Sequence, residues 1–226
     1  MSTKKRIRAC LFDLDGVIVD TARFHFIAWR RLANELGFDF TEEDNEKLKG
    51  VSRMGSLDLI LLWGGVALNQ KEKEHWAAIK NEWYLEMVRN MTPADILDGV
   101  LPFLADVKEH YCKVVLGSSS KNARTILRQV DLEDAFEAVI DGTVTTRTKP
   151  DPQVFEMGAE AVGVDPVQAI VFEDAAKGIE AALRGGFYAV GIGQSEVLGE
   201  AHLVLPNFIG RTFTEIERSL PLRSLT

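Results

Sequence analysis

Short apolar runs alternate with helical patterns along most of the chain. The apolar runs predict β-strands at residues 7–14, 113–117, 138–141, 169–172 and 188–192. Apolar residues at helical spacings predict helices between them, at residues 122–130, 152–162 and 175–184. Because strands that alternate with helices of this length build βαβ units, the pattern predicts an α/β fold with a doubly wound, mostly parallel sheet.

One long interval interrupts this alternation. The second predicted strand begins only at residue 113, whereas a simple βαβ crossover needs about 30 residues. Apolar residues from Phe24 to Leu36 recur at three- and four-residue spacings and predict a helix. The sequence Thr41-Glu42-Glu43-Asp44 resembles a capping box that opens a second helix, and residues 56–63 and 71–91 predict two more.

These helices predict a second domain inserted into the first. We expect an α/β core formed by residues 1–20 and 93–226, and an α-helical cap domain at residues 21–92. The chain then crosses between the two domains near Asp20-Thr21 and Thr92-Pro93, and these crossings are expected to act as hinges.

Composition narrows the class of protein. Of the 226 residues, 46% are hydrophobic and 27% are charged, which is typical of a globular protein that buries a core. The formal net charge of −8 disfavours nucleic acids and membrane surfaces as partners, because both are polyanions. The two cysteines, Cys10 and Cys112, are too few for a disulfide framework. Neither a signal peptide nor an apolar run of about 18 residues is present, so we expect a cytoplasmic protein.

Polar side chains gather where the predicted strands end. The first strand ends in Asp13 and Asp15, residues 118–122 follow the second strand, and Glu173 and Asp174 follow the fourth. Ligands of open parallel sheets bind at this edge. One acidic pair at a strand end is readily explained by helix and turn capping, but several such ends together predict a site.

The residue types indicate phosphoryl transfer. Asp13 and Asp15 lie two residues apart on an extended segment and project to the same side, and with Asp174 they offer the hard oxygen ligands that Mg²⁺ prefers. Lys149 offsets their charge, and hydroxyls and backbone amides of residues 118–122 suit a phosphate. A carboxylate nucleophile, a divalent cation and a phosphate cradle belong to that chemistry.

Four of these segments also resemble, in order, the motifs of the haloacid dehalogenase-like (HAD) hydrolase superfamily. They are Asp13-Leu14-Asp15-Gly16-Val17-Ile18, Ser118-Ser119-Ser120-Lys121-Asn122, Lys149-Pro150-Asp151-Pro152 and Glu173-Asp174. Residues 21–29 and 48–53 are similar to cap segments of the beta-phosphoglucomutase family within it. The resemblance spans nearly the whole chain and implies a Rossmann-like core with a helical cap.

The resemblance also implies roles for individual residues. Asp13 would be the nucleophile that becomes an aspartyl phosphate, and Asp15 the general acid and base. Mg²⁺ would be held by Asp13, the backbone carbonyl of Asp15, Glu173 and Asp174. The residues implied to bind substrate or phosphate are Thr21, His25, Trp29, Gly50, Val51, Ser52, Arg53, Ser56, Lys80, Ser118, Ser119, Ser120, Lys121, Asn122 and Lys149.

Several of these residues have simpler interpretations from the sequence alone. His25 and Trp29 could belong to the core, Lys80 could lie on a solvated helix face, and Ser119 could serve only its turn. The chain also departs from the family pattern at Val19, where the mutases have threonine, and at Asp151 and Gln153, which bears on substrate preference rather than on the reaction.

Two reactions remain open at this stage. One is a phosphohexomutase that interconverts beta-D-glucose 1-phosphate and glucose 6-phosphate through a bound bisphosphate, with Mg²⁺ and glucose 1,6-bisphosphate as cofactors. The other is a sugar-phosphate phosphatase that uses water as acceptor. Asp15 can activate either acceptor, but Arg53 favours a mutase, since a mutase must hold the second phosphate and exclude water. We expect a monomer whose partner is a small sugar phosphate.

Overall fold

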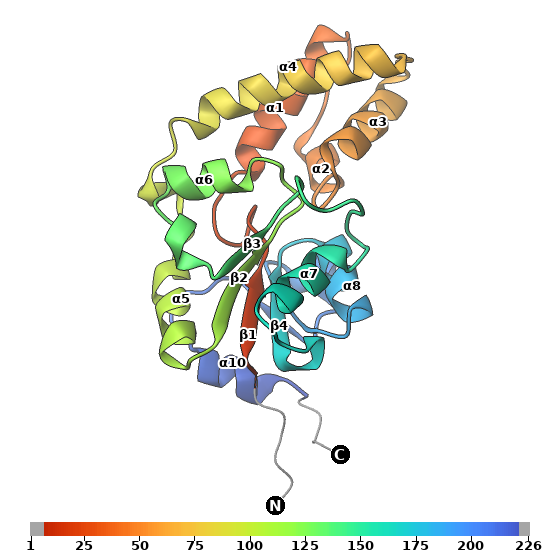
Figure 1. Cartoon of the computed structure of the whole chain (residues 1–226). Helices are drawn as coiled ribbons and strands as arrows, with labels where there is room; N and C mark the ends of the chain where they lie inside the picture. The colour runs from red at the N-terminus through yellow and green to blue at the C-terminus, as the bar shows by residue number, and fades with distance from the viewer. Residues whose placement is uncertain (1–6, 222–226) are drawn as a thin grey trace, which may run out of the picture.

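A parallel sheet with helices on both faces occupies one half of the molecule in the computed structural model, which describes residues 7–221 (Figure 1). Within these residues the sheet has six strands in the order β3-β2-β1-β4-β5-β6, and every neighbouring pair is parallel. The strands are β1 (Ala9–Phe12), β2 (Lys113–Gly117), β3 (Ala138–Ile140), β4 (Ala169–Glu173), β5 (Tyr188–Ile192) and β6 (Leu203–Leu205). The predicted α/β fold class is confirmed.

The central strands are mostly apolar because both of their faces are covered. Along β1, Cys10 and Phe12 belong to one apolar cluster, whereas Ala9 and Leu11 belong to the other. The helices of the first face are α5 (Val100–Glu109), α6 (Ala123–Gln129) and α10 (Phe213–Ser219), and those of the second are α7 (Gln153–Ala161) and α8 (Ala176–Arg184). Strands buried on both sides read as continuous apolar runs, which is why the sequence revealed them.

Two strands, β2 and β5, have their predicted bounds, and the other predicted strands differ at their ends. β1 is shorter than predicted, since only residues 9–12 pair with both neighbours. Four elements were not predicted from the sequence: the three-residue edge strand β6 and the helices α5, α9 (Ser195–Leu198) and α10. The short 3-10 helices η1 (Pro93–Asp95), η2 (Glu133–Ala135) and η3 (Pro166–Gln168) complete the described elements.

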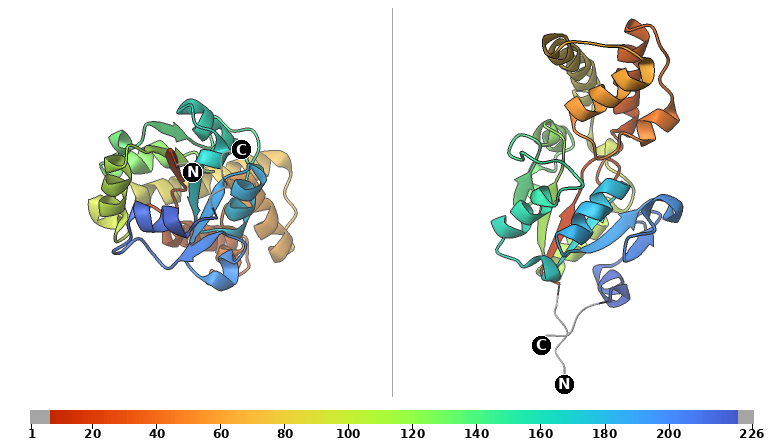
Figure 2. Two further views of the ribbon diagram at one scale, coloured as in Figure 1. Left: turned by 90° about the horizontal axis from the view of Figure 1, so that it is seen from below. Right: turned by 90° about the vertical axis from the view of Figure 1, so that its right-hand side faces the viewer.

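A second group of helices lies beyond the carboxyl ends of the strands (Figures 1 and 2). It consists of α1 (Ala22–Glu35), α2 (Glu42–Glu46), α3 (Arg53–Gly64) and α4 (Gln70–Val88). Trp29, Leu32, Phe40, Leu57 and other residues of this group form their own apolar cluster. The predicted capping box at the start of α2 is present, with the Thr41 side chain accepting from the amide of Asp44. We call this group of helices the cap. The exact domain limits at residues 20 and 92 stay a prediction. Residues 1–6 of the predicted core lie outside the residues that the structure describes.

The two crossings between the core and the cap lie against each other. The amide of Leu97 donates to the carbonyl of Ile18 at 3.0 Å, and that of Asp20 donates to the carbonyl of Asp95 at 3.4 Å. Arg23 at the start of α1 pairs with the side chain of Asp95 at 2.5 Å. Both connections therefore leave the core at one place, as hinge segments would.

Candidate active site

The carboxyl ends of β1, β2 and β4 bring the predicted core residues together beneath the cap. Asp13 and Asp15 follow β1, Ser118 follows β2, and Glu173 is the last residue of β4. Because these three strands are neighbours in the sheet, their ends meet. A cavity of about 440 Å³ opens there, between the strand ends and helices α1, α3 and α4.

The buried ammonium of Lys149 neutralises part of the negative charge of the carboxylates at the cavity. Its Nζ lies 2.6 Å from Asp13 Oδ1 and 2.5 Å from Glu173 Oε1, and it donates to the carbonyl of Gly117 at 3.2 Å. Burial by itself would lower the pKa of Lys149, but the charges of Asp13 and Glu173 outweigh it and raise that pKa above its ordinary value. Lys149 is therefore a permanent cation, and it holds Asp13 and Glu173 in fixed positions.

Asp13, Glu173 and Asp174 could together hold a metal ion. Each offers a carboxylate oxygen, and these oxygens lie within 4.8 Å of one another. Burial is the main cause that raises the pKa of both Glu173 and Asp174; the charge of Lys149 opposes it at Glu173, and the charge of Glu173 adds to it at Asp174. A bound cation would favour the ionised form of both, and a donor set of hard carboxylate oxygens fits a hard divalent cation such as Mg²⁺.

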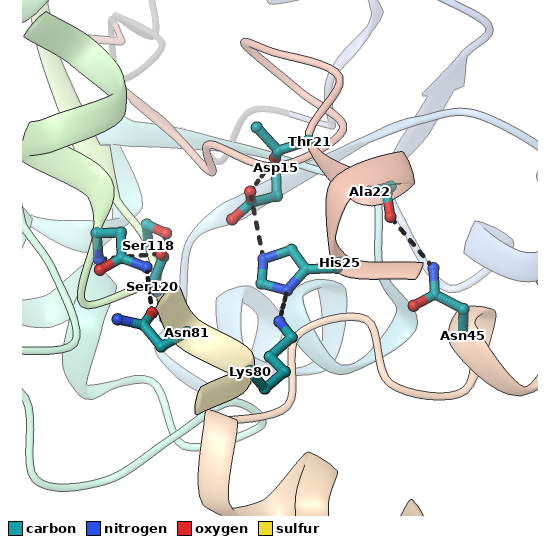
Figure 3. A network of polar contacts seen from close by, with 10 residues as sticks. Asp15, Thr21, Ala22, His25, Asn45, Lys80, Asn81, Ser118 and Ser120 are labelled. Carbon is teal, nitrogen blue, oxygen red and sulfur yellow. Dashed lines mark hydrogen bonds and ion pairs between the residues drawn. The ribbon is translucent and has the colours of Figure 1, made fainter. Parts of the chain in front are cut away.

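Asp15 lies beside Asp13 but contacts the cap rather than the cluster. The Thr21 hydroxyl donates a short hydrogen bond to Asp15 Oδ1, and His25 Nε2 lies 4.0 Å from the same oxygen (Figure 3). Burial, and next the charge of Asp13, raise the pKa of Asp15 to about 6, against the lowering effect of Thr21, Lys149 and Lys80. Such a carboxyl can give and take a proton near neutral pH.

A buried lysine extends this contact chain into the cap. Lys80 of α4 is only 2% exposed, and its Nζ lies 2.9 Å from His25 Nδ1 (Figure 3). The ammonium also faces the rings of Trp29 and Tyr84, at 4.3 and 4.9 Å from their centroids. Burial, followed by the nearby charge of Arg53, lowers the pKa of Lys80. The interpretation of Lys80 as a solvated residue is therefore wrong, because this position of α4 faces the cavity.

The turn after β2 lines the opposite wall with hydroxyl and amide groups. The amide of Ser120 donates to Ser118 Oγ at 3.1 Å, and that of Asn122 donates to Ser120 Oγ at 3.2 Å. The side chain of Asn122 donates to Asn81 Oδ1 of α4 at 2.9 Å, so it connects the core to the cap. These contacts fix a curved, polar turn at the cavity.

The segment before α3 presents Arg53 to the cavity. Gly50 has a φ of +72°, a left-handed conformation that favours glycine, and it turns the chain into α3. Ser52 then caps α3 by accepting from the amide of Gly55 at 3.3 Å. Arg53, the first residue of α3, has no carboxylate within 4.0 Å among residues 7–221, so its guanidinium is available to an anion.

Most of the predicted residues line this one cavity. Those that do are Asp13, Asp15, His25, Trp29, Gly50, Val51, Ser52, Arg53, Ser56, Lys80, Ser118, Ser119, Ser120, Lys121, Asn122 and Asp174. Thr21, Lys149 and Glu173 do not line it but are buried against residues that do, through Asp15 and Asp13. The roles assigned to all these residues stay predictions.

Three side chains of this site were not predicted from the sequence. Lys49 lines the cavity and lies 3.3 Å from Asp174, and Asn81 lines it beside Asn122. Tyr84 packs against His25 with ring centroids 4.3 Å apart and the rings tilted by 31°. A signal existed for two of them: Lys49 lies within the predicted cap segment 48–53, and Tyr84 lies four residues after Lys80 on the same face of one helix. Asn81, one residue after Lys80, had no such signal.

Fold and site together define a class of phosphoryl-transfer proteins built on a parallel sheet with a helical cap. The chain belongs to the haloacid dehalogenase-like hydrolase family, whose family model matches residues 7–186. It is 40% identical to the beta-phosphoglucomutase of Bacillus subtilis (strain 168), over 88% of this chain and 89% of that protein. It is 30% identical to a phosphorylated carbohydrates phosphatase of Thermotoga maritima, over 80% and 82% of the two chains.

A solved structure supports the same relationship. The crystal structure of the beta-phosphoglucomutase pgmB from Clostridium difficile matches with a TM-score of 0.91 and 40% identity, covering 94% of this chain and 96% of the other. The expected resemblance to this family is thereby confirmed. Within residues 7–221, no helix has the length and apolar character needed to cross a membrane.

Proposed function

We propose that this protein is a phosphohexomutase that interconverts beta-D-glucose 1-phosphate and glucose 6-phosphate. The observation that carries the proposal is the cavity itself. Asp13 and Asp15 line its core wall, Lys149 is buried behind Asp13, and Arg53, which pairs with no carboxylate of residues 7–221, faces the same space from the cap. An enzyme that transfers phosphoryl groups between two positions of one sugar needs both a reactive end and a grip on the second phosphate. The similarity to beta-phosphoglucomutases supports this assignment.

Asp13 acts as the nucleophile. Its carboxylate attacks the phosphorus of the sugar phosphate next to it, the bond from phosphorus to the sugar oxygen breaks, and an aspartyl phosphate forms. Asp15 gives its proton to the departing sugar oxygen, which leaves as a hydroxyl. Lys149 keeps Asp13 in place, and Ser118 with the turn after it donates hydrogen bonds to the oxygens of the moving group.

The return transfer uses the same groups in reverse. A sugar hydroxyl loses its proton to the carboxylate of Asp15, its oxygen attacks the phosphorus of the aspartyl phosphate, and the carboxylate of Asp13 leaves. Two such transfers with a glucose 1,6-bisphosphate between them convert one monophosphate into the other. The bisphosphate must present its second phosphate in turn, so Arg53, Ser120, Lys121 and Asn122 hold whichever phosphate is not reacting.

Asp13, Glu173, Asp174 and the backbone carbonyl of Asp15 would hold the metal, which we assign as Mg²⁺. The ion neutralises charge on the phosphoryl oxygens when bound. The contacts from Asp15 through His25 to Lys80 make the acid–base residue depend on the position of the cap. We further propose that residues 21–92 close over the sugar phosphate as a domain, and that the protein is a cytoplasmic monomer.

A phosphatase is the alternative, and a specific observation favours it. One of the relatives is named as a phosphatase of phosphorylated carbohydrates, although it shares the same fold family. The phosphatase reaction would use Asp13 and Asp15 in the same way, with water in place of the sugar hydroxyl. The alternative therefore differs only in the acceptor that the cap admits.

A phosphorus NMR time course separates the two reactions. The protein is mixed with beta-glucose 1-phosphate, Mg²⁺ and a trace of glucose 1,6-bisphosphate. We expect glucose 6-phosphate to accumulate with little inorganic phosphate. Dominant inorganic phosphate would instead establish the phosphatase. An Asp13→Asn variant is the control, and turnover retained in this variant would refute the aspartyl-phosphate mechanism.

A further inference from the structure

A lysine of the cap contacts the carboxylate cluster of the core, and the reaction described above gives it no task. Lys49 Nζ lies 3.3 Å from Asp174 Oδ2 and 2.9 Å from Glu46 Oε2. Glu46 ends α2, whereas Asp174 follows β4, so this ammonium connects the cap to the candidate metal site. Its side chain is 30% exposed and that of Asp174 is 10% exposed, so water screens the pair only in part.

The backbone beside Lys49 packs on the same loop of the core. A Cβ atom on Gly50 would lie 3.6 Å from Cβ of Ala175 and 3.7 Å from Cβ of Lys177, which is ordinary contact distance. Lys49 and Asp174 also line two cavities, the active-site cavity and an open one of about 930 Å³ on the other side. The Lys49–Asp174 pair therefore forms part of the wall between them, where the cap meets the core.

The ammonium of Lys49 and a divalent cation would compete for the carboxylate of Asp174. The ionised carboxylate of Asp174 attracts the ammonium of Lys49, and it would also attract a divalent cation held with Asp13 and Glu173. Two cations beside one carboxylate repel each other, and each reduces the attraction that the other experiences. By thermodynamic linkage, any weakening of the lysine contact by the metal must be matched by an equal weakening of metal binding by the lysine.

We propose that Lys49 is a positioning residue that couples the cap to the metal site, because its ammonium and the divalent cation are antagonists at Asp174. Metal binding then loosens the contact between cap and core, and the closed cap in turn weakens the hold on the metal. The inference rests on the metal site of the proposed function. With this coupling, the cap opens more readily after the metal has bound and before a sugar phosphate binds.

The chain offers matched controls for this proposal. Lys47 lies two residues before Lys49, but it pairs with Glu43 and Asp44 of α2, each at 3.2 Å. Lys47→Met therefore removes one positive charge from the same region without touching the core. Lys49→Met keeps an unbranched apolar side chain and removes the charge at issue, and Lys49→Arg keeps the charge.

The first measurement is the binding of Mg²⁺ to the full chain by titration calorimetry, without sugar phosphate. We expect Lys49→Met to bind Mg²⁺ about five-fold or more tightly than the wild type, the lower range of typical coupling energies. Lys47→Met and Lys49→Arg should stay close to the wild type. Equal or weaker affinity in Lys49→Met would overturn the proposal, as would an equally large effect of Lys47→Met.

The second measurement follows the cap by small-angle X-ray scattering. The radius of gyration of the wild type should increase when Mg²⁺ is added, and that of Lys49→Met should be larger from the start and insensitive to Mg²⁺. A wild type that does not bind Mg²⁺ would refute the metal site and the coupling together. Mg²⁺ binding and the Lys49 effect without mutase turnover would refute the proposed reaction and leave the coupling standing.

Discussion

Asp15 owes its suitability as an acid and a base to its surroundings. Burial and the charge of Asp13 raise its pKa to about 6, while the Thr21 hydrogen bond stabilises its ionised form. A carboxyl in water has a pKa near 4 and is almost fully ionised at neutral pH. The shift leaves a useful fraction of Asp15 protonated, which the departure of a sugar oxygen requires.

This pKa predicts how the free enzyme reacts with glucose 1,6-bisphosphate. Asp15 must be protonated in this step, so kcat/KM for transfer to Asp13 should fall about ten-fold for each pH unit above about 6. Measurement of kcat/KM from pH 5 to 8 gives this dependence. The binding of bisphosphate to Asp15→Asn over the same pH range corrects for ionisation of the substrate. A rate independent of pH would contradict the assignment of Asp15 as the acid.

Lys80 shows the cost of placing a charged group inside the cap. Since its pKa is lowered in the folded protein, the unfolded chain binds a proton at Lys80 more readily, and this difference destabilises the fold at pH 7. The destabilisation should disappear as the pH rises through the ordinary lysine pKa. Lys80→Met keeps the apolar contacts with Trp29 and Tyr84 and removes the charge.

We therefore expect Lys80→Met to be more stable than the wild type by about 1 kcal/mol or more at pH 7, and to lose mutase activity. Thermal and urea unfolding at pH 7 measure the stability. Lys71→Met, on the exposed first turn of the same helix, is the control and should change neither property. A lower stability of Lys80→Met would show that the contacts of the ammonium outweigh its burial.

The part of the site that lies at the strand ends could be predicted from the sequence more fully than the part on the helix faces of the cap. The runs at 113–117 and 188–192 identified β2 and β5 with their bounds, since strands buried on both faces form nearly continuous apolar runs. The acidic and hydroxyl residues that follow such strands were then placed together by the rules of parallel sheets. β6 escaped prediction because a three-residue edge strand has too little pattern to detect.

The cap side of the site was harder to predict. α4 carries charged residues on several faces, so its sequence does not distinguish the buried Lys80 from its solvated neighbours. Lys49 was missed because its importance comes from Asp174, which lies far away in the chain and meets Lys49 only in the folded protein. Contacts of this kind depend on how the cap sits on the core, and no local pattern encodes that.

A glycine in the first turn of α8 determines where one side chain of the site can lie. A Cβ atom on Gly178 would lie 1.9 Å from Cδ of Glu173, so only glycine lets the Glu173 side chain lie over the first turn of the helix. In that position Glu173 Oε2 accepts from the amide of Ala175 at 3.0 Å, and Oε1 reaches Lys149. The helix thus determines where one carboxylate of the candidate metal cluster points.

Gly178→Ala should displace Glu173, weaken Mg²⁺ binding about ten-fold or more and reduce turnover with it. Gly158→Ala is the control, because its Cβ would meet Val115 and Leu11 of the core at 3.0 and 3.1 Å, away from the carboxylates. That variant should lower the melting temperature without changing Mg²⁺ affinity. Calorimetry measures the Mg²⁺ affinity of both variants, and thermal unfolding measures their melting temperatures. Normal Mg²⁺ affinity in Gly178→Ala would contradict the role of this glycine in positioning Glu173.

The contacts between cap and core differ from one end of the interface to the other. Near the crossings, Tyr84, Val88 and Met91 belong to the same apolar cluster as Phe12 and Phe172 of the sheet. Around the cavity, the contacts are polar, and they include Asn122–Asn81 and Lys49–Asp174. Water can replace such partly exposed polar contacts at little cost, whereas apolar burial resists separation. The cap should therefore open at the cavity and stay attached at the crossings.

Opening of this kind makes Arg53 the residue that selects the acceptor. When a sugar bisphosphate or monophosphate bridges the cavity, its second phosphate pairs with Arg53 and closes the cap on the core, which excludes water from Asp15. Arg53→Ala should then lower kcat/KM for glucose 6-phosphate formation by about 10- to 100-fold, the loss expected for hydrogen bonds between charged groups. Hydrolysis of the aspartyl phosphate, which needs no second phosphate, should change far less.

The ratio of glucose 6-phosphate to inorganic phosphate, followed by phosphorus NMR, measures this selection directly. Arg30→Ala provides the control, because Arg30 is an exposed cap arginine that pairs with Asp39 and does not line the cavity. Its product ratio should match the wild type. Equal losses of mutase and hydrolytic turnover in Arg53→Ala would mean that the guanidinium supports both reactions alike, and the exclusion of water would then have to come from the polar contacts around the cavity rather than from the phosphate.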